Sequence, residues 1–230
     1  MSAAIKAATG GDGAETARLP AVLACLTLVS GFVDAVSYIG LGHVFTANMT
    51  GNVVILGFAT AGTPGFSRRA ATASLAGFLL GAVTGGRLAV LLGARHRWVG
   101  AALTLEAAGM VLALAITAIA PLNEVRYAVI ALLGLAMGCR NAMTRRVGLP
   151  DLTTTVLTGT LTGLAAESSV AGGDNPRFRR RFGSVLLMFT GALAGAWLLR
   201  VHGLTTCLVA DAAAVLAILA GYLLAARRRR

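Results

Sequence analysis

A polar stretch occurs twice in this chain, each time within apolar sequence. The first copy consists of Ser30-Gly31-Phe32-Val33-Asp34-Ala35, Gly40-Leu41 and Thr46-Ala47-Asn48-Met49-Thr50-Gly51-Asn52. The second consists of Met137-Gly138-Cys139-Arg140-Asn141-Ala142, Gly148-Leu149 and Thr154-Thr155-Val156-Leu157-Thr158-Gly159-Thr160. Two later matches follow in the same order at an offset of 105 to 110 residues, pairing 81–85 with 191–195 and 103–108 with 208–213. The pattern predicts two homologous membrane repeats, 19–120 and 125–226, and matched polar breaks are typical of transporter binding sites.

The composition places the chain in a membrane. It is 57% hydrophobic and 13% charged, with a mean hydropathy of +0.78, whereas soluble domains carry about 25% charged residues. A helix needs about 20 apolar residues to cross the hydrocarbon core. The apolar stretches are 19–41, 44–63, 70–93, 98–120, 125–138, 152–172, 182–199 and 205–226. We therefore expect an all-α polytopic membrane protein.

The number of crossings depends on the second stretch of each repeat. Both stretches, 44–63 and 152–172, begin with several Thr or Asn residues, so only their later parts suit lipid. With six full transmembrane helices and two broken or short polar ones, more of the basic residues fall on the inner side, which the positive-inside rule favours. The two halves would then have inverted topology. Eight crossings, with parallel halves, is the alternative.

The net charge of +11 is explained by orientation in the membrane, because the arginines lie between the apolar stretches or at their ends. A nucleic-acid partner is therefore not expected. Residues 1–18 form a predicted disordered tail, and residues 227–230 form a basic tail that would contact anionic lipid headgroups. We expect both termini in the cytoplasm.

Several ionisable residues fall within predicted spans or just beyond their ends, where such groups are costly and usually functional or paired. Asp34 and Arg140 occupy neighbouring positions of the two copies, and we expect them to form an ion pair, either structural or functional. Glu106 and Asp211 are matched acids in the fourth stretch of each half. They could carry protons in a coupled transporter, or bond to Thr and Ser on neighbouring helices.

Irregular backbone at membrane depth is tolerated only inside protein or beside a cavity, so the two broken segments predict a polar site between the halves. The N-termini of helices there would favour an anion or carboxylate. Alternatively, the hydroxyl groups bond to carbonyls of their own helix. No metal site, cofactor site or nucleophile–base pair is recognisable. The candidate substrate-binding residues are Asp34, Asn48, Thr50, Gly51, Asn52, Arg140, Asn141, Thr155, Thr158, Gly159 and Thr160.

Three of the apolar stretches carry glycines at helical spacing, which would form a face of small residues on each helix. Glycines recur at every fourth position in 77–85, 134–138 and 191–195. Such faces let helices approach closely in lipid. They could hold the two halves together or form a homodimer.

The motif chain also resembles a known family. Gly31-Phe32-Val33-Asp34-Ala35, Asn48-Met49-Thr50-Gly51-Asn52, Arg140-Asn141-Ala142 and 150–162 are similar to the YoaK family of bacterial membrane proteins. The resemblance covers nearly the whole chain after Arg18 and implies a multi-pass protein of the bacterial inner membrane. It implies no activity and no site residues.

Taken together, the sequence predicts a transporter or permease that moves a small polar or anionic solute through a site between the repeats. The alternative is a non-transporting membrane scaffold that binds a partner helix through its small-residue faces. An intramembrane enzyme is not expected.

Overall fold

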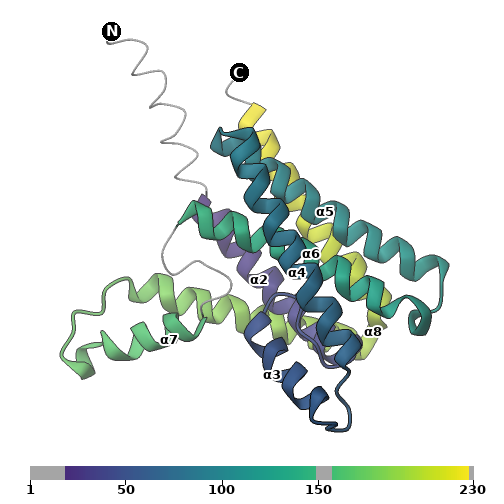
Figure 1. Ribbon diagram of the computed structural model, residues 1–230. Coiled ribbons are helices and arrows are strands. Elements are labelled where there is room, and N and C mark those ends of the chain that lie inside the picture. The colour runs from purple at the N-terminus through teal and green to yellow at the C-terminus, as the bar shows by residue number, and fades with distance from the viewer. Residues whose placement is uncertain (1–18, 149–156, 228–230) are drawn as a thin grey trace.

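The computed structural model describes residues 19–148 and 157–227, and the described chain is all-helical (Figure 1). Five of its helices are long and apolar enough to cross a membrane, as expected of a polytopic membrane protein. The elements in order are α2 (Leu19–Gly40), α3 (Met49–Thr60), α4 (Arg68–Leu92), α5 (Arg95–Ile119), α6 (Leu122–Val147), α7 (Leu157–Ala166), the 3₁₀ helix η1 (Ser169–Ala171) and α8 (Phe178–Arg227).

The last helix consists of two segments. At Gly203 the backbone leaves the helical region, with φ 79° and ψ 178°. A straight helix of its 50 residues would be about 75 Å long, whereas the hydrocarbon core is about 30 Å thick. The sharp bend of α8 is visible in Figure 1. Residues 178–202 and 204–227 therefore behave as separate helical segments, each of membrane-spanning length.

The helices meet in two apolar clusters that define two ends of the bundle. One cluster, the first end, joins the start of α2 and of α5 to the final turns of α4, α6 and α8, through Leu19, Trp98, Leu92, Val147 and Tyr222. The other cluster contains residues at the opposite termini of the same segments, namely Leu41, Ala70, Ile116, Val125 and Leu204. We call this side of the bundle the second end. The long segments thus run alternately between the two ends.

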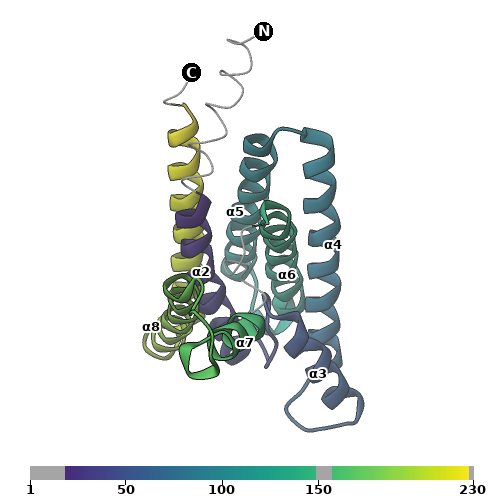
Figure 2. The ribbon, with the colours of Figure 1, turned by 90° about the vertical axis from the view of Figure 1, so that its left-hand side faces the viewer.

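Two helix pairs pack with their backbones in close contact, α2 with α8 and α4 with α6 (Figure 2). A Cβ atom on Gly31 would overlap the carbonyl oxygen of Met188, and one on Gly138 would overlap that of Phe78. Contacts advance along both helices in the same direction, so each pair is parallel. The glycine faces identified in the sequence therefore lie between helices of this chain.

The contacts of the two pairs correspond. Positions that the sequence repeat aligns make equivalent contacts in both pairs: Gly31–Met188 with Gly138–Phe78, Leu28–Gly191 with Leu135–Gly81, and Phe32–Gly195 with Cys139–Gly85. In both pairs, the first helix of one predicted repeat packs against the second long segment of the other.

The polarity of the bundle is that of a membrane protein. Large apolar side chains are exposed on its outer surface, among them Leu79, Leu91, Phe189, Leu193 and Trp197. Charged side chains are fully buried inside, including Arg140 and Glu106. This arrangement suits a lipid surround, in which the outer surface needs no polar groups.

Candidate functional site

The chain after α2 folds back into the bundle and is held there by Asp34. One carboxylate oxygen, Oδ1, accepts backbone N–H groups from Thr46 at 3.0 Å and from Ala47 at 2.7 Å. Asp34 is only 5% exposed. Backbone amides at membrane depth have no water to bond, so a carboxylate that accepts two of them supports an irregular segment there. We call residues 41–48 the re-entrant loop.

Asn52 fastens the same loop to α3 and α4. Its Oδ1 accepts the Phe45 N–H at 2.8 Å, and its Nδ2 donates to the Phe45 carbonyl at 2.6 Å. Nδ2 also donates to Ser74 Oγ on α4 at 2.9 Å, and Ser74 donates to the Phe45 carbonyl. Gly51 is needed for the same packing, because a Cβ there would press on the Phe45 ring. The side chain of Asn52 thus replaces the backbone partners that an ordinary helix would give Phe45.

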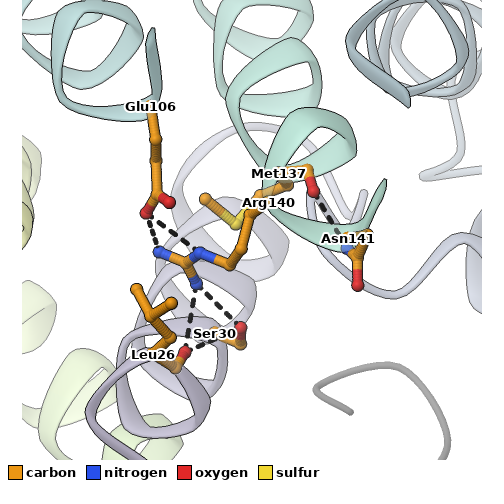
Figure 3. A network of polar contacts seen from close by, with 6 residues as sticks. All are labelled: Leu26, Ser30, Glu106, Met137, Arg140 and Asn141. Carbon is orange, nitrogen blue, oxygen red and sulfur yellow. Dashed lines mark hydrogen bonds and ion pairs between the residues drawn. The ribbon is translucent and has the colours of Figure 1, made fainter. Parts of the chain in front are cut away.

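The predicted ion pair between Asp34 and Arg140 is wrong. Arg140 instead pairs with Glu106 of α5, to which both its Nε and Nη2 donate (Figure 3). Its Nη1 donates to Ser30 Oγ at 2.8 Å and to the Leu26 carbonyl at 3.1 Å, both on α2. The backbone amides of the re-entrant loop already supply the donors that the Asp34 carboxylate requires. Arg140 therefore joins α2, α5 and α6 in the bundle centre.

Asp211, the residue that the repeat aligns with Glu106, is placed differently. It is 3% exposed, and neither of its carboxyl oxygens has a hydrogen-bond partner among the described residues. The second carboxyl oxygen of Glu106, Oε2, is likewise buried and has no hydrogen-bond partner among the described residues. Arg140 and Glu106 are close enough to interact electrostatically with Asp211. In the described structure, a buried carboxyl without a hydrogen-bond partner thus lies within electrostatic range of a complete ion pair.

A cavity of about 760 Å³ lies between the re-entrant loop, α4 and α6. Its polar lining comes from both predicted repeats, and it lies in the part of the bundle nearer the first end. Figure 3 shows that Arg140 and Asn141 leave α6 in different directions, toward Glu106 and away from it. The lining residues are Asn48, Met49, Thr50, Phe78, Ala82, Gly86, Asn141, Ala142, Thr144, Arg145 and Arg146.

Helix α3 begins at this cavity. The side chain of its N-cap residue, Asn48, makes no capping hydrogen bond, although Asn is among the preferred capping residues. Within the described residues, the first-turn amide groups of α3, which have no partner inside the helix, therefore lack a side-chain cap from Asn48 and can bond to a ligand or solvent. With Arg145 and Arg146 on the facing helix, the cavity combines the positive end of a helix dipole with two cations.

The predicted binding residues divide into several groups. Asn48, Thr50 and Asn141 line the cavity. Asp34, Gly51 and Asn52 build the re-entrant loop, and Arg140 belongs to the ion pair. Thr158 and Gly159 are exposed on α7, where Thr160 is buried, and none of the three is in the cavity lining. Thr155 lies outside the described residues.

Sequence reasoning missed Thr144, Arg145 and Arg146 as cavity residues. The apolar stretch of the sequence ends at 138, which predicts that the two arginines lie in a loop. The helix instead continues to Val147 and ends at Gly148, whose φ of 67° suits glycine. Residues at i, i+3 and i+4 of a helix share a face, and Asn141, Thr144 and Arg145 have this spacing. That periodicity is the signal that could have found them.

No group of His, Cys, Asp and Glu side chains that could hold a metal ion exists among residues 19–148 and 157–227. Of the cysteines, Cys139 and Cys207 are buried and Cys25 is exposed, all as free thiols. The polar side chains that line the cavity are cations, amides and hydroxyl groups.

Comparison with known proteins identifies the family. The family model described as "Protein of unknown function (DUF1275)" matches residues 22–222, nearly the whole described chain. The chain belongs to the DUF1275 family. This DUF1275 chain is also 34% identical, over 151 residues, to the UPF0700 transmembrane protein YoaK of Bacillus subtilis (strain 168). The match covers 64% of the chain and 66% of that relative, just under two thirds of its length.

The match confirms the resemblance to the YoaK family, and the relative is named a transmembrane protein. No solved structure matches this DUF1275 chain. With its apolar helices, the chain is an integral, multi-pass membrane protein.

Proposed function

We propose that the protein transports a small anionic solute across the bacterial cytoplasmic membrane, and that the cavity at the start of α3 binds this solute. The observation that carries the proposal is the meeting of an uncapped helix N-terminus with Arg145 and Arg146 across one cavity. Helix N-termini and paired arginines both favour carboxylates, phosphates and similar anions. Asn48, Thr50 and Asn141 add neutral donors and acceptors that would orient the bound anion.

The architecture supports transport by two inverted repeats. The equivalent contacts of α2 with α8 and of α4 with α6 are those expected of an internal duplication. Six long segments, with α8 divided at Gly203, alternate between the two ends, whereas α3 and α7 are too short to cross. Inverted repeats with a discontinuous helix at the substrate site are a common plan of secondary transporters.

The distribution of arginines supports a cytoplasmic first end. Segments that begin or finish at this end carry Arg95, Arg97, Arg145, Arg146 and the group at 177–181, whereas Arg68, Arg69, Arg126 and Arg200 belong to the second end. By the positive-inside rule, the start of α2 and the end of α8 then face the cytoplasm. The cavity lies nearer the cytoplasmic side, as expected of a carrier in an inward-facing state.

The scaffold alternative has less support. It required small-residue faces free to bind a partner helix. In the described structure, the glycines at 77–85, 134–138 and 191–195 pack against helices of the same chain. A partner, including a second copy, would therefore use other surfaces.

Anion binding can be tested on the purified protein in detergent. Acetate, sulfate and inorganic phosphate serve as probes of three shapes, with uncharged glycerol as the neutral probe, and thermal unfolding is measured. A ligand at 100 times its Kd stabilises the folded state by about 2.7 kcal/mol. We expect at least one anion to raise the melting temperature, and glycerol not to reproduce the effect at equal concentration.

The double variant Arg145→Gln with Arg146→Gln should abolish this shift. The matched control is Arg95→Gln with Arg97→Gln, which removes the same charge from exposed positions at the same end. Loss of the shift in both double variants would indicate non-specific charge effects and contradict the cavity as the site. An anion that binds would then be used in proteoliposome counterflow, in which uptake of labelled anion must depend on the same two arginines.

A further inference from the structure

The repeat-related acids Glu106 and Asp211 belong to one group of buried charged residues, together with Arg140. In the described structure, Glu106 has a cationic partner, whereas Asp211 does not. Glu106 neutralises Arg140 through hydrogen bonds from Nε and Nη2. Asp211 is almost fully buried, and neither of its oxygens receives a hydrogen bond from the part of the chain that the structure describes. With all three side chains ionised, the cluster would keep one uncompensated negative charge.

Residues 19–148 and 157–227 offer the Asp211 carboxylate no further compensating charge. Arg140 on α6 and Glu106 on α5 are the charged groups that act on it, and Arg140 is already held by Glu106 and α2. On its own helix, Cys207 is one turn away, and on α2 the Asp34 carboxylate is occupied by the re-entrant loop. A buried carboxyl without a cation or a donor takes up a proton rather than remain charged.

A metal cation fits this cluster less well than a proton. Hard cations such as Ca²⁺ and Mg²⁺ require about six or more oxygen ligands. The oxygens without a partner here are Oδ1 and Oδ2 of Asp211 and Oε2 of Glu106. One proton on Asp211 is enough to make the cluster neutral.

We propose that Asp211 binds one exchangeable proton, which is the coupling ion of the transport cycle. The coupling role rests on the proposed anion transport, whereas proton binding does not depend on it. Proton uptake would leave Glu106, Arg140 and Asp211 jointly neutral, and proton release would place a second negative charge beside the ion pair. Proton release would weaken the ion pair between Glu106 and Arg140, because the Asp211 carboxylate would compete for the same guanidinium group. Arg140 joins α2, α5 and α6, and the next residue in the chain, Asn141, lines the cavity.

Infrared difference spectroscopy of the purified protein in lipid tests proton binding. We expect a carbonyl-stretch band of a protonated, buried carboxyl group that shifts in D₂O and is lost as the pH is raised. Asp211→Asn should remove this band, whereas Glu124→Gln, which changes an exposed acid at the start of α6, should leave it intact. Asp211→Glu should retain a band at a shifted frequency, which separates loss of the group from misfolding.

Several results would overturn the assignment. The band could be absent from the unaltered protein, persist in Asp211→Asn, or fail to shift in D₂O, which would indicate an acid closed to water. Loss of the band when choline chloride is replaced by NaCl at constant pH would assign the site to Na⁺ instead. Arg145→Gln with Arg146→Gln should keep the band while losing anion binding, so failure of the cavity and failure of the proton site are distinguishable.

Discussion

Replacing Glu106 by Gln should destabilise the protein strongly, because it leaves Arg140 as a buried cation without a counterion. Arg140 is 0% exposed, and two of its four hydrogen bonds go to Glu106. The other two go to neutral oxygens of Ser30 and Leu26. Removing one partner of a buried ion pair costs about 3–5 kcal/mol. We expect a loss in this range for Glu106→Gln.

The double variant Glu106→Gln with Arg140→Gln separates the pair from general damage at these positions. With both charges removed, no ion is left alone, so the double variant should be more stable than Glu106→Gln by about 2–3 kcal/mol. Reversible unfolding by SDS in mixed micelles measures these differences. Glu124→Gln, at an exposed position, is the control and should stay within about 0.5 kcal/mol.

The stability of Asp211→Asn can be compared with that of Glu106→Gln, because the sequence repeat aligns the two acids. Asp211→Asn replaces a neutral carboxyl by a neutral amide, so it should cost much less than Glu106→Gln. Equal losses at the two positions would mean that Asp211 is an ionised partner of Arg140. A double variant no more stable than Glu106→Gln would refute the pairing itself.

Further predictions follow from the helix contacts, the re-entrant loop and the topology. Gly138→Ala should sharply reduce the membrane abundance of the protein, because its Cβ would overlap backbone of α4, whereas Gly57→Ala, with open space around it, should be neutral or stabilising by up to about 1 kcal/mol. Asp34→Ala should cost at least about 3 kcal/mol in the same unfolding assay, because two hydrogen bonds to a charged acceptor are lost; a cost below about 1 kcal/mol would show that the loop holds without it. In a background with the exposed cysteine replaced by serine, a membrane-impermeant thiol reagent added outside spheroplasts should label Thr63→Cys and not Ala171→Cys; the reverse pattern would invert the proposed orientation.

The sequence alone predicted the membrane class and the approximate positions of the helices. Runs of about 20 apolar residues have few options other than helices in lipid, because every backbone polar group must be satisfied within its own segment. The polar start of the second stretch likewise predicted a break, and α3 does begin only at Met49, after the re-entrant loop. These features follow from composition along the chain.

The partners of the buried charges were decided only by the tertiary structure. Asp34 and Arg140 were paired in the prediction because they are neighbours in the aligned copies, but alignment within a repeat carries no information on which helices pack together. Packing places α5 beside α6, so Glu106 reaches Arg140, while the chain after α2 folds back to give Asp34 its donors. Hydrogen bonds act over about 3 Å, so a choice among buried acids depends on helix packing that no local pattern specifies.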